Sequence, residues 1–421
     1  MDVTDNSPYL CSKIKREGFL SERRSDSTHL LLAVYLPALV FAISKGLLIP
    51  VMPLYVRSFD VSYGLVGLVL AAESAGTLLS DMPAGVLIRR MGHKRSMLLG
   101  AAFSISGALA MFWVDSLVWV VFFRVVSGAG AALWGISRHA YIADLVQVQR
   151  RGRSIAVMGG IGRIGAFVGP ALGGLVGAEY GLRAPFLVYA LLGLLGVVAV
   201  LLWVRGDEEG VDESQVVVHV SLWSVFRGHM QPLLTAGSGQ LCAQLIRAAR
   251  HIIIPLYASD ILGLDVSSVG LIISVSSAID MLMFYPAGVI MDRFGRKFAY
   301  VPSFTLQAIG MAMIPLTETY LGLQLVALFI GLGNGLGSGT MMTLGADLAP
   351  ARSRGEFLGI WRFIGDAGSA TGPVFIGSIA EVLGLAFAPW GVAFIGLAGA
   401  AILAGLVPET LDKSGLKKAP L

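Results

Sequence analysis

Ionisable side chains interrupt several long apolar stretches of this sequence. Arg247 and His251 lie in one such stretch with Gln240 and Gln244, at spacings of four, three and four residues. On a helix these four side chains fall within about 60° of one another and form a narrow polar stripe. A cation on such a stripe can bind a carboxylate, phosphate or sulfonate group. The pattern predicts anion binding. We find no nucleophile, metal-ligand spacing or nucleotide-binding loop, and expect neither an enzyme nor a cofactor.

A second cation, Lys45, occupies the equivalent place in another apolar stretch. Both stretches contain Pro-Leu-Tyr, at 53–55 and 255–257, and this alignment sets Lys45 opposite Arg247. Two cations at symmetric positions would attract an anion from both sides. The alternative, that Arg247 and Arg250 only pair with acids of neighbouring helices, stays open. The residues that we predict to bind substrate in a cavity are Lys45, Arg247, Gln244, Gln240, His251, Arg250 and Arg124.

Three acidic side chains within apolar stretches, Glu73, Asp280 and Asp366, are candidates for carrying a proton. A carboxyl group that is removed from water can hold a proton at neutral pH, which an exposed one does not. An acid that is paired with arginine stays ionised, however, unless the substrate competes for that arginine. The sequence therefore leaves open whether protons or a counter-substrate drive the protein.

The composition indicates that lipid surrounds the elements that position these residues. Hydrophobic residues make up 55% of the 421 and charged residues 14%, with a mean hydropathy of +0.76. Ordinary soluble domains have about 25% charged residues. The net charge of +4 is spread in small clusters, which argues against nucleic acid. Since a span needs about 20 apolar residues, we predict twelve helices, at roughly 29–56, 61–88, 96–115, 117–142, 154–178, 184–204, 231–258, 264–291, 298–317, 320–344, 355–382 and 386–407.

The two halves of the chain repeat each other at an offset of 203 residues. Ala143-Asp144-Leu145 returns as Ala346-Asp347-Leu348, and Arg151-Gly152 returns as Arg354-Gly355. We therefore predict a duplicated membrane unit. Its parts are a tail (1–28), a six-helix bundle (29–204), a linker (205–230), a second six-helix bundle (231–408) and a tail (409–421).

The loop cations predict the orientation in the membrane. Nearly all of them fall on the side that also holds both tails, whereas the opposite loops hold only Arg57 and Arg183. Lys and Arg are retained on the cytoplasmic side of membranes. We therefore expect a multi-pass protein of the plasma or inner membrane with both termini in the cytoplasm.

A charged glycine-containing loop follows the second apolar segment of each half. The first loop has Arg89 and the second has Asp292 at nearly equivalent places. Glycine permits a backbone bend that other residues resist. The motif residues are Gly85, Arg90, Gly92 and Lys94 in the first half, and Gly288, Asp292, Arg293, Gly295 and Arg296 in the second.

A second motif reads Gly165-x-x-x-Gly169-Pro170-x-x-Gly173-Gly174, and a third reads Arg124-x-x-x-Gly128-x-Gly130. With the charged loops, these motifs resemble the major facilitator superfamily, and most closely its twelve-helix drug and metabolite:proton antiporters. The resemblance covers nearly the whole chain. It implies an all-α membrane protein of 12 transmembrane helices in two pseudo-symmetric six-helix bundles. The chain departs from the family at Arg89, where an aspartate is usual.

The resemblance also implies which helices meet across the two halves. It places the fifth helix against the eighth and the second against the eleventh, which predicts the ion pairs Arg163–Asp280 and Glu73–Arg362. The local alternative is that Arg362 pairs with Asp366 four residues later.

The function that we expect is a secondary active transporter that works by alternating access. The cavity cations favour export of a small organic, anionic solute in exchange for protons. The alternatives are a solute importer, a phosphate-type anion exchanger, and a membrane receptor of the same fold that does not transport. The expected partners are the solute, protons or a counter-substrate, and the lipid bilayer, with no nucleic acid. We expect a monomer.

Overall fold

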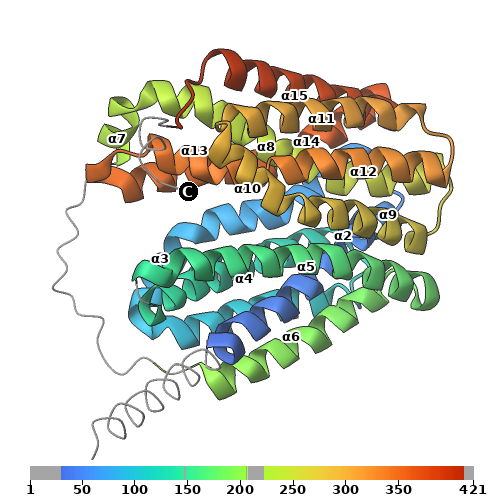
Figure 1. Cartoon of the computed structure of the whole chain (residues 1–421). Coiled ribbons are helices and arrows are strands. Elements are labelled where there is room, and N and C mark those ends of the chain that lie inside the picture. Colours follow the sequence, from blue (N-terminus) through green and yellow to red (C-terminus); the bar gives the residue numbers. More distant parts are fainter. Residues whose placement is uncertain (1–29, 147, 205, 207–221, 412–421) are drawn as a thin grey trace, which may run out of the picture.

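The computed structural model describes residues 30–146, 148–204, 206 and 222–411. The predicted tail 1–28, most of the predicted linker 205–230 and residues 412–421 of the last tail lie outside the described residues. The described chain forms helices joined by short loops (Figure 1).

The first half of the chain supplies six spans. Its elements are η1 (Leu31–Tyr35), α2 (Leu36–Arg57), α3 (Tyr63–Ala110), α4 (Leu117–Leu145), α5 (Val148–Tyr180) and α6 (Ala184–Trp203). Helix α3 contains two spans, because the chain bends at Gly92, whose φ of 79° and ψ of 171° are not helical. The predicted loop between the second and third spans is therefore a sharp kink at this glycine.

The second half supplies the other six spans, and two of them are broken. The eighth span divides at Met283 into α9 and α10, and the tenth divides at Gly337 to Gly339 into α12 and α13. The elements are α7 (Leu222–Gly228), α8 (Met230–Leu256), η2 (Tyr257–Ile261), α9 (Val266–Leu282), α10 (Phe284–Arg293), α11 (Lys297–Met313), η3 (Ile314–Leu316), α12 (Tyr320–Leu336), α13 (Thr340–Leu348), η4 (Ala351–Ser353), α14 (Arg354–Leu383), η5 (Leu385–Phe387) and α15 (Ala388–Gly405).

Twelve spans result from these helices, as predicted. Nine stretches of the described chain are long and apolar enough to cross a membrane, and one of them, α3, holds two spans. Helices α8, of 27 residues, and α14, of 30 residues, complete the set. Both carry several of the ionisable residues discussed above, which lowers their mean hydropathy.

Side-chain contacts repeat in the two halves and so confirm the duplication. Lys94 Nζ donates to the carbonyl of Leu201 at 3.0 Å, and Lys297 Nζ, 203 residues later, donates to the carbonyl of Ala404 at 2.7 Å. The two halves therefore share contacts as well as sequence, and they lie as two bundles side by side (Figure 1).

The Pro-Leu-Tyr alignment is also matched by contacts. Tyr55 Oη donates to the carbonyl of Val114 at 3.1 Å, and Tyr257 Oη donates to that of Thr317 at 3.1 Å. The tyrosines are 202 residues apart and their acceptors 203. The one-residue difference assumed for the first loop is thus present, and Lys45 and Arg247 are equivalent positions of the two bundles.

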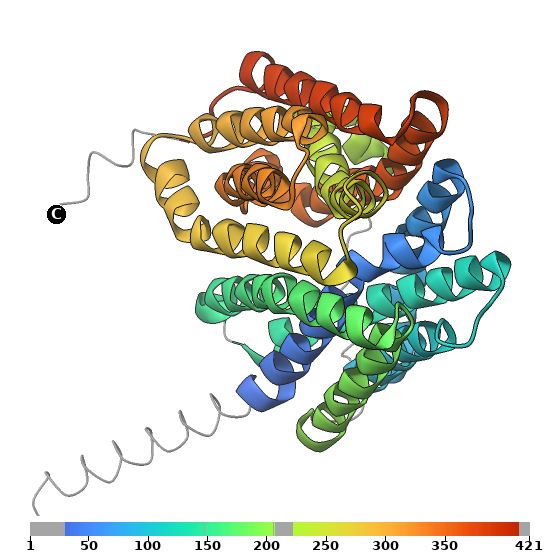
Figure 2. The ribbon, with the colours of Figure 1, turned by 90° about the vertical axis from the view of Figure 1, so that its right-hand side faces the viewer.

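Glycines bring the two bundles together at one end, which the view of Figure 2 faces. A Cβ on Gly67 of α3 would overlap the carbonyl oxygen of Pro373 in α14, and one on Gly270 of α9 would overlap that of Pro170 in α5. These contacts are equivalent in the repeat.

We call the end where α2 begins and α15 ends the terminal end, and the end with the glycine contacts the opposite end.

Candidate functional site

A cavity of about 620 Å³ lies between the two bundles. Residues of α2 to α6 line it from the first bundle, and residues of α8 and α14 from the second. Glu73 is the single carboxylate among its lining residues, whereas four permanent cations line it. The lysine, arginine, histidine, glutamate and glutamine residues of the lining are Lys45, Glu73, Arg124, Arg138, Gln244, Arg247 and His251.

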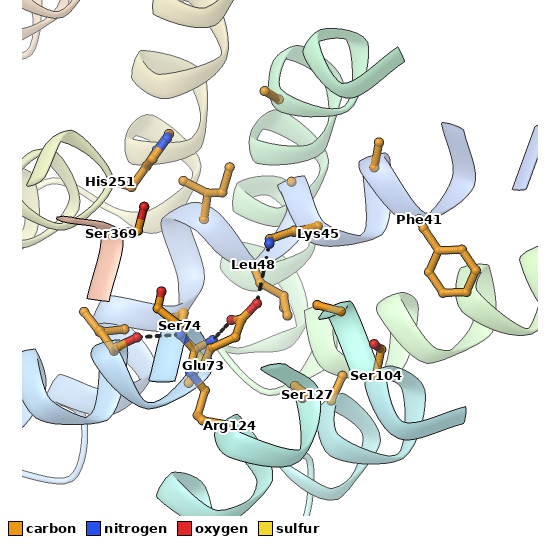
Figure 3. Close-up of a pocket in the computed structure, with 18 of the residues that line it drawn as sticks. Phe41, Lys45, Leu48, Glu73, Ser74, Ser104, Arg124, Ser127, His251 and Ser369 are labelled. Atoms are coloured by element: carbon orange, nitrogen blue, oxygen red, sulfur yellow. Dashed lines mark hydrogen bonds and ion pairs between the residues drawn. The ribbon is translucent and has the colours of Figure 1, made fainter. Parts of the chain in front are cut away.

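Glu73 holds two of these cations within the first bundle (Figure 3). Its Oε2 lies 2.5 Å from Arg124 Nη1, and its Oε1 lies 3.6 Å from Lys45 Nζ. Arg124 Nη2 also donates to the carbonyl of Leu70 at 3.0 Å. The exposed fraction of the Lys45 side chain is 71%, against 10% for Arg124. The guanidinium group of Arg124 is therefore held by protein partners, whereas most of the Lys45 side chain is accessible.

Arg247 is held from the second bundle by an amide. Its Nε donates to Asn334 Oδ1 at 3.0 Å, and Asn334 Nδ2 donates to Asp280 Oδ2 at 2.6 Å. Asn334 lies in the last turn of α12, just before the break of the tenth span. Nη1 and Nη2 of Arg247 take part in neither of these two bonds. Arg247 also lines the cavity.

Asp280 is the centre of a buried network between the bundles. Arg163 Nη1 of α5 donates to its Oδ1 at 2.6 Å, and Arg250 Nη2 lies 3.9 Å from its Oδ2. Ser338, in the broken part of the tenth span, accepts a bond from Arg163 Nη2 at 2.7 Å. The break at Gly339, whose φ is 74°, sets this serine beside the carboxylate. The predicted contact between Arg163 and Asp280 is present.

Two of the residues predicted to bind substrate in the cavity do not line it. Gln240 packs its side-chain amide against Gly365 of α14. Arg250 follows Arg247 by three residues, which turns it about 60° away, and its buried side chain faces Asp280 instead. The predicted cavity position is therefore wrong for these two. Lys45, Arg124, Gln244, Arg247 and His251 do line the cavity, as the sequence predicted.

The predicted pair between Glu73 and Arg362 is wrong. Glu73 is held by cations of its own bundle, and Arg362 lies 3.4 Å from Asp366 and 3.8 Å from Asp81. Asp81 follows Glu73 by eight residues and so lies about 12 Å nearer the terminal end along α3. At that level it is within reach of Arg362 of α14. The ion pair between the second and eleventh spans therefore uses Asp81. Asp366 is paired locally and does not line the cavity.

Polar contacts close the opposite end of the cavity. Arg57 Nε at the end of α2 lies 3.1 Å from Asp260 Oδ2, and Tyr63 Oη donates to the same oxygen at 2.9 Å. The backbone N–H of Gly64 donates to Glu381 Oε2 at 3.2 Å. All three contacts join one bundle to the other. Nothing in the sequence pointed to these contacts beyond the presence of Arg57 in a loop with few cations.

The charged loop of the second half forms a closed network. Gly295 has a φ of 122°, and Arg296 contacts Asp292 and Asp347 at 3.1 Å each. The same network binds the chain after α15, because Glu409 accepts from the backbone N–H of Arg296 at 2.8 Å. In the first half Gly92 and His93 hold the places of Gly295 and Arg296, and His93 Nε2 lies 2.8 Å from Asp144 Oδ2. Gly85 and Gly288 have open space around them.

The glycines of the predicted antiporter motif serve close packing. Any Cβ on Gly165, Gly169 or Gly173 would overlap the backbone of α2, and one on Gly174 would approach Gly270 of α9. One face of helix α5 thus packs against α2 of its own bundle, and the adjacent face packs against α9 of the other bundle. The Pro170 carbonyl takes part in the second contact.

Sequence reasoning missed three lining residues at the terminal side of the cavity. Phe41 and Trp134 pack against each other with ring centroids 4.4 Å apart, and Arg138 follows Trp134 by one turn. An apolar ring pair is hard to tell from ordinary core packing in a sequence. The i,i+4 spacing of Trp134 and Arg138 was the available signal.

Comparison with known proteins decides the family. The sequence pattern of the Major Facilitator Superfamily matches residues 34–237 and again residues 236–419. The chain belongs to the Major Facilitator Superfamily. It is therefore a multi-pass membrane protein and a secondary transporter of a small-molecule substrate, not an enzyme.

The relatives and structural neighbours are distant. An uncharacterised transporter of this superfamily from Methanocaldococcus jannaschii is 20% identical over 84% of this chain and 92% of its own length. The class C tetracycline resistance protein of Escherichia coli is 23% identical over 80% of this chain and 86% of its own. The crystal structure of a bacterial homologue of the human lysosomal transporter Spinster, inward-facing and unoccupied, has a TM-score of 0.71 at 16% identity, covering 90% of this chain and 95% of that one.

Proposed function

We propose that this transporter exports a small organic anion in exchange for protons across the cell membrane. The observation that carries the proposal is the charge of the cavity, where four permanent cations meet one carboxylate. A buried charge without a partner is costly, so such a cavity is best filled by an anion. A lipophilic cation would add to the excess of positive charge.

Lys45 and Arg247 are the residues that would bind the anion. They are equivalent in the repeat and line the cavity from opposite bundles, and each has donors that its own protein partner leaves free. An anion between them would contact both bundles at once. Such a ligand stabilises the conformation in which Lys45 and Arg247 are close enough to contact it together. A solute that stabilises one conformation in this way can control alternating access.

The state of the molecule is compatible with loading from the cytoplasm. With both termini in the cytoplasm, the terminal end faces the cytoplasm and the closed opposite end faces outward. The cavity lining runs along α2 from Ala38 to Pro53, and Gly162 of α5 lines it with no atom within 4 Å of an added Cβ. Such a cavity would load solute from the cytoplasm. The similarity to a tetracycline resistance protein fits this direction.

Glu73 is the best placed of the three proton candidates. It lines the cavity and holds Lys45, so a substrate that binds Lys45 competes with Glu73 for the same ammonium group. While the anion is bound, Arg124 still holds Glu73 and keeps the carboxylate ionised. Asp280 lies behind Arg247, and Asp366 does not line the cavity. The emptied carrier would then return with Glu73 protonated, so that one anion is exchanged for one proton.

The experiment is a flux assay in proteoliposomes loaded with a pH-sensitive dye, with succinate, benzoate and inorganic phosphate as trial solutes. We expect at least one organic anion to move, with protons moving the opposite way. Arg247→Ala should abolish both fluxes. Arg227→Ala, which removes an exposed arginine of α7 outside the cavity, should leave them unchanged.

Three outcomes would contradict the proposal. Transport of tetraphenylphosphonium in place of all anions would refute the anionic solute. Anion and proton fluxes in the same direction would indicate cotransport and refute the exchange. Saturable binding of an anion without flux in the native protein would indicate a receptor.

A further inference from the structure

The terminal half of the cavity has a regular arrangement of side chains on two antiparallel helices. Phe41 and Lys45 are one turn apart on α2, and Trp134 and Arg138 are one turn apart on α4. Residues four apart lie on the same face of a helix, and all four of these line the cavity. Helix α2 runs away from the terminal end, whereas α4 runs towards it.

The antiparallel directions set the order of these residues along the cavity. Phe41 and Trp134 lie at the same level, because their ring centroids are 4.4 Å apart. Lys45 then lies one turn deeper and Arg138 one turn nearer the terminal end. Figure 3 shows Phe41 beyond Lys45, on the side away from His251. Since one turn of four residues rises about 6 Å, the two cations stand about 12 Å apart along the helix axes.

The aromatic pair is held rigidly. Gly196 of α6 lies against the Phe41 ring, where a Cβ would come within 2.7 Å of Phe41 Cε2. Trp134 covers the Phe41 ring on another side, and both side chains are buried. A fixed ring surface binds an apolar body without first losing side-chain freedom.

Arg138 has no counter-charge in the described part of the chain. No described carboxylate lies within ion-pair distance of its guanidinium group, and its Nε is buried without a hydrogen-bond partner. This distinguishes it from Arg124, Arg163 and Arg250, each of which meets an acid. A half-buried cation that faces a cavity without a counter-charge calls for an anionic group of the ligand.

From this order of cation, aromatic pair and cation we infer that the transported solute is an elongated dianion with an apolar middle. One acidic group binds Lys45 and Arg247 in the centre, the apolar body lies on Phe41 and Trp134, and the second acidic group binds Arg138. The inference rests on the proposed function and names its substrate class.

Three probes test the inference. Sebacate is an α,ω-dicarboxylate whose carboxyl carbons are roughly 11 Å apart when extended, at about 3.6 Å for every three bonds. Monomethyl sebacate has the same length with one charge removed, and succinate has two charges on a short body. Binding of each to the purified full-length protein is measured by titration calorimetry.

We expect native protein to bind sebacate about tenfold more tightly than either of the other probes, the effect of one charge-assisted contact. Arg138→Gln should lower sebacate affinity to that of the monomethyl ester and leave the ester and succinate unchanged. Arg138→Lys should restore part of the difference, and Arg227→Gln should change nothing. Trp134→Ala should weaken sebacate and its ester but not succinate.

Equal affinity of sebacate and its monomethyl ester for native protein would overturn the inference, as would an equal loss of succinate binding in Arg138→Gln. The proposed function survives both of these results, because anion binding at Lys45 and Arg247 does not need Arg138. If none of the three anions binds native protein, the anionic cavity ligand is refuted and the inference falls with it.

Discussion

Asp280 in α9 and Arg163 in α5 form an ion pair that joins the two bundles, with Nη1 and Oδ1 2.6 Å apart. Arg250 and, through Asn334, Arg247 lie on the same carboxylate. One acid thus serves three arginines at the interface between the two bundles. Its removal leaves more charge without a partner than the removal of any one of its cations.

Asp280→Asn should therefore destabilise the protein more than Arg163→Gln. Breaking a buried pair from one side costs about 3 to 5 kcal/mol, and we expect the asparagine variant to reach this range. The glutamine variant leaves Asp280 with Arg250 and Asn334 and should lose less. Thermal unfolding in detergent measures both variants and the double variant. If the effects of the two single changes simply add, the pair does not couple the bundles.

Glu73→Gln should separate solute exchange from the proton gradient. Glutamine cannot carry a proton or hold Lys45 as an ion partner, so the ammonium group is free for the anion. Exchange of labelled for unlabelled anion should persist, whereas a pH gradient should no longer drive accumulation. The matched control is Glu179→Gln, at an exposed end of α5. Accumulation that still follows the pH gradient in the Glu73 variant would place the proton site elsewhere.

Gly67→Ala and Gly270→Ala should hold the opposite end open. The added Cβ meets a proline carbonyl of the other bundle in each case, and such overpacking costs about 1 to 3 kcal/mol. That penalty is present only in the state described here. Spin labels at Ser58 and Glu318 report the separation of the bundles at this end, and the distance should increase. Gly85→Ala, in the same helix as Gly67 but with open space around it, should not change it.

Glu409 should give the terminal end a pH-dependent stability. Burial alone would raise the pKa of Glu409, but the backbone N–H groups of Lys297, Leu411 and Arg296 together lower it below the usual 4.5. A lowered pKa stabilises the folded state above the ordinary value, and this contribution is lost as the pH falls through the lowered one. Glu409→Gln should therefore lower the melting temperature at pH 7 and approach the native value near pH 3. A constant difference across this range would mean that the charge of Glu409 has no role.

The fold was predictable because membrane spans leave strong local signals. Each span needs a long apolar run, and the 203-residue repeat showed that the runs belong to two copies. The alignment of Lys45 with Arg247 depended on the Pro-Leu-Tyr repeat alone, and the tyrosine contacts of the two bundles match it.

Partners across helices were decided by the tertiary structure. Glu73 has the opposite charge to Arg362 but pairs with Arg124. Arg362 lies near Asp81 instead, because Asp81 is about two turns further along α3, at the level of Arg362. Gln240 shares a stripe with Arg247, yet α14 covers it. Periodicity gives the face and height of a residue on its own helix. The neighbour that covers that face depends on how the bundles pack, which no single segment encodes.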